Sequence, residues 1–159
     1  MNLMPSLAKL SVAMLLVAAP VWSASIEVTL DSSLQSAEPG DVVTFTGTIE
    51  NTGVDTVYLN GFSSTFPLGG VDDSAFFLLP ASLAPFGTAS GPLFSVMIPG
   101  GAALGLYAGT FNVLGGDTPT SFDLLATQTF AVNVVPEPSS ALLALGGVFA
   151  LILRRRTRS

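Results

Sequence analysis

Hydrophobic and polar residues alternate along most of the middle of the chain, which predicts β-strands rather than helices. Ile26, Val28 and Leu30 are separated by polar residues, so one face of this segment is apolar. The same period of two runs through residues 43–50, after a turn-forming Glu-Pro-Gly-Asp segment. No long stretch of the middle shows helical periodicity. We expect strands over residues 26–30, 43–50, 57–59, 75–79, 93–98, 106–114 and 124–134.

These short strands predict an all-β fold, an immunoglobulin-like β-sandwich of about seven strands, flanked by an N-terminal signal helix and a C-terminal single transmembrane helix. The segment Gly105–Gly109 (Gly-Leu-Tyr-Ala-Gly) resembles the tyrosine corner of immunoglobulin domains, with Gly109 where antibody domains place cysteine. The segment from Pro39 to Gly53 is similar to bacterial immunoglobulin-like adhesion modules, in which a Pro-Gly-Asp turn leads into a strand ending in Asn-Thr-Gly. A jelly roll or another small sandwich is the alternative.

The first 23 residues have the pattern of a secretory signal peptide. Lys9 precedes an apolar run from Leu10 to Val21, and the small residues Ser23 and Ala24 follow. We expect cleavage between Ser23 and Ala24, after export through the Sec translocase, which would leave residues 24–134 as the exported domain. An uncleaved N-terminal anchor is the alternative.

The last 25 residues, 135–159, fall into three parts: a Val-Pro-Glu-Pro motif at 135–138, an apolar segment at 139–153 and a basic tail at 154–159. Because proline cannot occupy a helix interior, a helix can begin only after Pro138, at Ser139 or Ser140. Its apolar length of roughly 20–22 Å is shorter than the ~30 Å hydrocarbon core of a bilayer. A marginal span suits a temporary membrane stop better than a lasting one, with a plain tail anchor or an interfacial helix as alternatives.

This three-part tail resembles the PEP-CTERM sorting signal of bacterial exosortase substrates. The resemblance implies that an exosortase, a separate membrane enzyme, removes the tail and passes the remainder to the cell surface or the extracellular matrix. It also implies that the apolar helix holds the precursor in the inner membrane. The residues concerned are Val135, Pro136, Glu137 and Pro138 for recognition, and Arg154, Arg155 and Arg156 for the cytoplasmic stop. The positive-inside rule independently places the middle of the chain outside that membrane.

Charge limits the partners of the exported domain. Between Ala24 and Leu153 the chain has no Lys, Arg or His, and residues 25–134 carry ten carboxylates, so their formal charge is −10. Nucleic acid and anionic membrane surfaces are therefore poor partners, because binding them requires cations. Internal salt bridges between side chains of this domain are impossible, and no cysteine is present to form a disulfide.

The same inventory argues against an enzyme. Without His, Cys or Lys, the usual nucleophile–base pairs, thiol chemistry and zinc sites are unavailable, so we expect no catalytic residues, no metal and no cofactor. Asp72 and Asp73 supply only part of a calcium shell, and we interpret them as solvated loop residues, with weak calcium binding as the alternative. Five phenylalanines fit either the core, which we prefer, or a sugar-stacking surface: Phe62, Phe66, Phe76, Phe77 and Phe86.

The sequence thus predicts an exported, non-enzymatic surface or extracellular-matrix protein, with extracellular polysaccharide as a further candidate partner. One alternative is a carbohydrate- or protein-binding adhesion module that its tail anchors permanently. A less favoured one is a hydrolase that uses two carboxylates.

Overall fold

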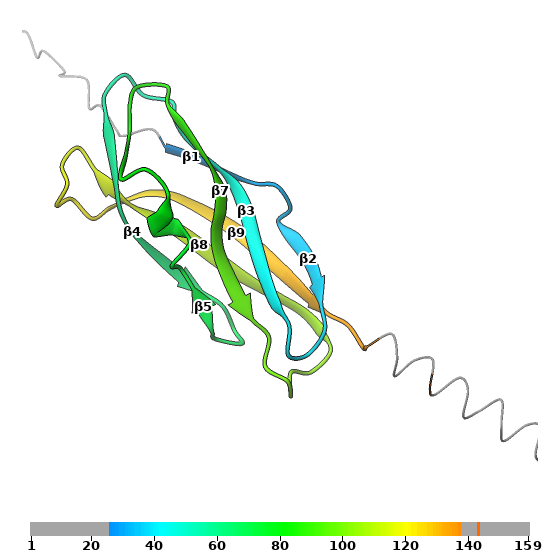
Figure 1. The fold of residues 1–159 in the computed structure, drawn as a ribbon. Helices are drawn as coiled ribbons and strands as arrows, with labels where there is room; N and C mark the ends of the chain where they lie inside the picture. Colours follow the sequence, from blue (N-terminus) through cyan, green and yellow to red (C-terminus); the bar gives the residue numbers. More distant parts are fainter. Residues whose placement is uncertain (1–25, 138–142, 144–159) are drawn as a thin grey trace, which may run out of the picture.

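The computed structural model describes residues 26–137 and Leu143, and residues 26–137 form an all-β sandwich of two sheets (Figure 1). The described part of the chain starts at one end of the sandwich and leaves it at the other. No helix within this part is long and apolar enough to cross a membrane. The predicted terminal helices, the cleavage residues Ser23 and Ala24, Pro138 and the arginines Arg154, Arg155 and Arg156 lie outside the described residues.

Nine strands and one 3-10 helix make up the described part. They are β1 (Ile26–Leu30), β2 (Leu34–Ala37), β3 (Val42–Asn51), β4 (Val57–Thr65), β5 (Val71–Asp72), η1 (Phe76–Leu78), β6 (Ser82–Leu83), β7 (Thr88–Met97), β8 (Gly105–Gly116) and β9 (Asp123–Val134). The first sheet has the order β1-β3-β7-β5 and is antiparallel throughout. The second sheet has the order β2-β9-β8-β4-β6, and in it only β2 and β9 run parallel.

Phenylalanine rings from both sheets fill the centre of the sandwich. The ring of Phe94 on β7 stacks between Phe45 on β3 and Phe111 on β8, with centroid distances of 4.9 Å to each. Phe130 on β9 packs against Phe45 and Phe94 at 4.9 and 4.8 Å. These four rings are 0–2% exposed. Period-two alternation explains their position, because each strand directs every second side chain toward the facing sheet.

The predicted tyrosine corner forms near the start of β8. The Tyr107 hydroxyl donates a hydrogen bond to the carbonyl oxygen of Ala103 at 2.9 Å. Two residues later, a Cβ at Gly109 would lie 2.5 Å from Cζ of Phe130 and 2.6 Å from the carbonyl oxygen of Thr65. The phenylalanine ring thus occupies the space that a side chain at position 109 would need.

The prediction of a strand over residues 75–79 is wrong, because residues 76–78 form the 3-10 helix η1. Its backbone has the hydrogen bonds typical of a 3-10 helix: the N–H groups of Phe76, Leu78 and Leu79 each donate to the carbonyl oxygen three residues earlier. The uniformly apolar Phe-Phe-Leu-Leu run contains no alternation to specify a strand, and only Phe76 is buried. The three short strands β2, β5 and β6 were not predicted, since two to four residues are too few to show a period.

A buried asparagine fixes the loops at the end of the sandwich where β3 ends. Asn51 is fully buried, and its Nδ2 donates to the carbonyl oxygens of Asp55 (2.7 Å), Ala84 (3.0 Å) and Leu83 (3.2 Å). Its Oδ1 accepts a bond from the Gly53 N–H at 3.0 Å. One side chain therefore joins the β3–β4 loop to the end of β6.

The turn held by Asn51 has an unusual backbone. Gly87 donates its N–H to the carbonyl oxygen of Ala84 at 2.9 Å, and Phe86 between them has a φ of 57°. This left-handed conformation costs a residue with a side chain about 1–2 kcal/mol relative to glycine. The Asn51 bonds to the start of this turn help to offset that cost.

We expect Asn51→Ala to lower the free energy of unfolding by about 3 kcal/mol, because several buried carbonyl groups lose their donor together. Urea unfolding of the purified protein measures this change. The matched control is Gln35→Ala, which removes a single side-chain hydrogen bond, the one that Nε2 donates to the carbonyl oxygen of Thr44. The control should cost about 1 kcal/mol or less. Equal losses in the two variants would show that Asn51 does not hold the loops.

Candidate functional site

The predicted recognition motif begins where the last strand ends. β9 stops at Val134, and the Val135 N–H donates to the carbonyl oxygen of Ala37 at 2.9 Å, which extends the pairing of β9 with β2 by one bond. Pro136 and Glu137 are exposed. No linker therefore separates the sandwich from the motif, and Pro136 is the first exposed residue of the motif.

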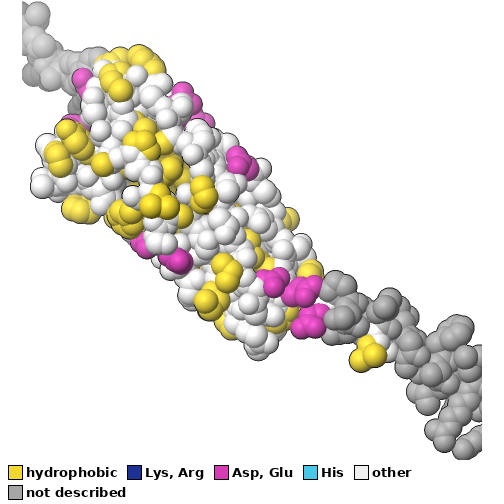
Figure 2. All heavy atoms as spheres, in the orientation of Figure 1, with side chains coloured by type: hydrophobic (Ala, Val, Ile, Leu, Met, Phe, Trp, Pro, Cys, Tyr) yellow, Lys and Arg dark blue, Asp and Glu magenta, His cyan; other side chains and the backbone are white. Residues whose placement is uncertain are grey.

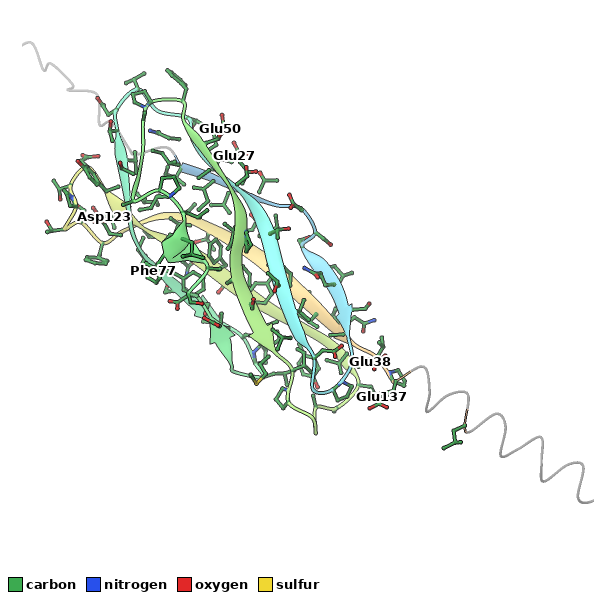
Figure 3. The ribbon with its side chains drawn as sticks, viewed as in Figure 1. Glu27, Glu38, Glu50, Phe77, Asp123 and Glu137 are labelled. Carbon is green, nitrogen blue, oxygen red and sulfur yellow. The ribbon has the colours of Figure 1, made fainter. Side chains whose placement is uncertain are left out.

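The acidic side chains of the described residues are distributed over several parts of the surface (Figure 3). Glu38 and Glu137 lie at the end where the chain leaves the sandwich, and Glu27 and Glu50 lie near the other end. Glu27 on β1 is the register partner of Glu50 on β3, and both are exposed. No group of three or more acidic, histidine or cysteine residues in residues 26–137 is arranged to hold a metal ion.

Asp72, one of the two aspartates considered for weak calcium binding, lines an open hollow of about 310 Å³ beside β5 and β7. Its Oδ1 accepts a hydrogen bond from the Ser74 N–H at 2.9 Å. This bond, with one from the Ser74 side chain, lowers the pKa of Asp72 below its usual value. Asp72 is therefore ionised at neutral pH and unsuited to the role of a proton donor. The remaining lining residues are Val42, Gly70, Val71, Ser95 and Met97, so this hollow contains a single carboxylate.

The five phenylalanines considered for the core or for a binding surface divide between the two. Phe76 is buried, and Phe62 and Phe66 pack partly buried against the core, as expected. Phe77 and Phe86 are 60% and 66% exposed, so the expectation of core packing is wrong for them. Figure 2 shows hydrophobic side chains gathered on the surface around η1, the helix that carries Phe77.

Sequence reasoning missed a regular pattern on the outer face of the second sheet. Residues that are register partners on β4, β8 and β9 share a face, so their side chains form rows across the three strands. Two adjacent rows consist of hydroxyl and amide side chains. These rows are Thr65, Thr110 and Thr129, and Ser63, Asn112 and Thr127.

Hydrogen bonds join the polar side chains within each row. Thr65 and Thr110 share a bond of 2.7 Å between their hydroxyl groups. Asn112 donates from Nδ2 to Ser63 Oγ at 3.1 Å and accepts at Oδ1 from the Thr127 hydroxyl at 2.8 Å. These bonds fix the orientation of side chains that still face solvent.

The next row of the same face is apolar. It consists of Gly61, Leu114 and Leu124, and Phe122 lies beside it. A Cβ at Gly61 would come within 3.2 Å of Cε1 of Phe122, so the ring lies directly over this glycine. Phe122 is 64% exposed and Leu124 is 63% exposed.

The loop before Phe122 is held in place by Asn60 of β4. Its Nδ2 donates to the carbonyl oxygens of Thr118 (2.8 Å) and Ser121 (2.9 Å). The hydroxyls of Thr118 and Ser121 also share a bond of 2.7 Å. The exposed ring of Phe122 is thus positioned by a fixed loop.

The rows of this face carry no charge. Residues 57–65 of β4, 105–116 of β8 and 124–134 of β9 include no Asp, Glu, Lys or Arg, although the domain has ten carboxylates. The exposed Asp123, which is the first residue of β9, borders the face between Phe122 and Leu124. We call the outer surface of these three strands, with Phe122, the neutral face. The lack of charge in these three stretches is visible in the sequence, but only the register shows that the polar residues align in rows.

Neither the family models nor the curated proteins give a match to this sequence. Among solved structures, the chain resembles a family 123 glycoside hydrolase from Clostridium perfringens, studied for glycolipid glycan hydrolysis, with 12% identity and a TM-score of 0.49. The match covers 71% of this chain and 27% of the hydrolase, so this chain spans about a quarter of that protein.

A second similar structure is the seventh ScaB type I cohesin from Pseudobacteroides cellulosolvens. The identity is 10%, the TM-score is 0.38, and the match covers 71% of this chain and 94% of the cohesin. Both TM-scores are below 0.5, so neither likeness says anything about the function of this protein.

We expect Glu50→Gln to raise the free energy of unfolding by about 0.5 kcal/mol at low salt, because it removes the repulsion between directly opposed carboxylates. Screening should reduce this gain at high salt. The control Asp55→Asn changes the net charge equally at an exposed loop position without a cross-strand partner. Urea unfolding at two salt concentrations measures both variants. A gain in the control as large as in Glu50→Gln would assign the effect to net charge instead.

Proposed function

We propose that this chain is an exported, non-enzymatic surface or extracellular-matrix protein with an immunoglobulin-like sandwich, sorted by an exosortase through its C-terminal tail. The observation that carries the proposal is the order of the tail. A Pro-Glu-Pro motif, an apolar segment and an arginine cluster follow one another at residues 135–159. The sandwich ends immediately before this motif.

The local geometry supports processing at the motif. Val135 and Glu137 each precede a proline, which disfavours helical backbone at both positions and favours an extended chain. Pro136 and Glu137 are exposed, while Val135 is bonded to the sheet. An enzyme at the membrane would therefore meet an accessible, extended segment directly below a compact domain.

The proposed route begins with the N-terminal signal. The Sec translocase exports the chain, residues 1–23 are removed, and the sandwich faces the periplasm while residues 139–153 span the inner membrane. The arginines from Arg154 to Arg156 stay in the cytoplasm under the positive-inside rule. Removal of the tail then passes the sandwich to the cell surface or the matrix.

The chemistry of the domain supports a non-enzymatic role. Hydrogen bonds from Ser74 lower the pKa of Asp72, the acidic residue of the hollow, and the exported domain has no His, Cys or Lys to act as its partner. Its hydroxyl-rich sheet surfaces and net negative charge suit a hydrated extracellular environment. The second candidate function is a binding module that remains anchored by its tail, which the exposed neutral face favours.

We expect protein recovered from the native host to start near Ala24 and to end between Val135 and Pro138. The double variant Pro136→Ala/Glu137→Ala should instead retain the tail through Ser159, because the recognition motif is lost. Intact mass and terminal peptides measure both ends of the chain.

The matched control is Glu38→Ala, which removes a carboxylate at the same end of the sandwich without changing the motif. This control should be processed like the unmodified chain. An unmodified chain that still ends at Ser159 would contradict sorting by proteolysis and favour the anchored binding module.

A further inference from the structure

We infer that the neutral face is a binding platform for uncharged polysaccharide chains, with Phe122 as its stacking residue. The inference rests on the proposed function, since an exported matrix protein meets such chains, and it adds a ligand class and the residues that contact it. The neutral face extends about 13 Å along β8 between the row of Thr110 and the row of Leu114. It is thus an elongated surface.

Charge separates this face from the rest of the domain. Six carboxylates lie on the strands of the first sheet or directly next to them: Glu27, Asp31, Asp41, Glu50, Asp72 and Asp73. A cationic partner would bind that sheet, and an anionic polymer would be repelled by a domain of charge −10. On the neutral face an uncharged chain meets three rows without a carboxylate, and Asp123 lies at the border beside Phe122.

The side chains of this face match the two kinds of surface that a sugar ring presents. Its C–H face packs on apolar or aromatic groups, and the exposed ring of Phe122 beside Leu124 provides such a surface. Its hydroxyl groups both donate and accept hydrogen bonds, as do the hydroxyls and amide of the two polar rows. Asn112 uses one N–H for Ser63, which leaves its other N–H for a ligand.

The surface is prepared for binding before any ligand arrives. Asn60 holds the loop that carries Phe122, and Gly61 leaves room for the ring against the sheet. The polar rows are oriented by their own hydrogen bonds. Such preorganisation reduces the entropy lost on binding, which matters most for a weak, extended ligand.

A second copy of this chain is the main competing occupant, and the composition of the face argues against it. The centres of stable protein interfaces are enriched in aromatic and other apolar residues. Here the centre consists of six polar side chains. Apolar residues border it on both sides: Gly61, Leu114 and Leu124 on one side, and Ala108 and Ala131 on the other. A homodimer would have to bury those polar side chains against the same polar side chains.

The test measures binding of the full chain, purified in detergent, to a panel of uncharged hexasaccharides: gluco-, manno-, xylo-, galacto- and N-acetylglucosamine oligomers. Hexagalacturonate is the charged comparison. We expect saturable binding to at least one uncharged oligomer, unchanged between about 0.05 and 0.5 M NaCl because no ion pairs form. Hexagalacturonate should not bind.

Phe122→Ala should weaken that binding about tenfold, because it removes the stacking surface. Asn112→Ala should weaken it as well. The matched control is Phe86→Gly, which removes another phenylalanine of similar exposure, from the turn before β7. The control should bind like the unmodified chain.

Three results would overturn the inference. These are no binding to any uncharged oligomer, binding that Phe122→Ala leaves unchanged, and a dimer in sedimentation that Phe122→Ala dissociates, which would assign the face to a second copy. Binding by the full chain in detergent does not depend on removal of the tail. Failure here therefore leaves the sorting proposal intact, and failure of sorting leaves this result standing.

Discussion

Stacked phenylalanines hold this sandwich together, because the domain lacks the other common means of joining two sheets. No disulfide can form in a chain without cysteine, and no side-chain salt bridge can form where every charged residue is acidic. Phe45 and Phe94 from the first sheet meet Phe111 and Phe130 from the second, with centroid distances of 4.8–4.9 Å. Gly109 leaves room for this packing, since a side chain there would collide with Phe130.

Because apolar packing alone fills the core, the outer faces of the two sheets can differ in charge without affecting it. Like charges repel, so an acidic domain without cations is more stable when its carboxylates are spread out. Apart from Asp123 at the start of β9, they occupy the loops and the strands of the first sheet, where Glu27 and Glu50 nevertheless face each other. The second sheet carries no charge on β4, on β8 or on β9 after Asp123. Hydroxyl and amide hydrogen bonds stabilise its surface. The two outer faces thus differ in charge because of where the carboxylates lie, while the same core lies beneath both faces.

Period-two alternation was enough to predict an all-β fold and the approximate positions of β1, β3, β7, β8 and β9. It failed where alternation is absent, as in the Phe-Phe-Leu-Leu run that forms η1, and where strands are too short, as in β5 and β6. The tyrosine corner was predictable because a local motif specifies it. The neutral face was not, because Ser63, Asn112 and Thr127 come together only through the pairing of three strands distant in sequence.

The missing linker between fold and motif has a physical consequence for the proposed precursor. Val135 is bonded to Ala37, so a membrane helix starting after Pro138 would hold the sandwich close to the lipid headgroups. Glu38 and Glu137 lie at that end, so anionic headgroups on the periplasmic side of the membrane would repel them. A long linker would relieve this repulsion, and so would cleavage within the motif. A close, acidic attachment is therefore better suited to a transient precursor than to a lasting anchor, in agreement with an apolar segment shorter than a bilayer.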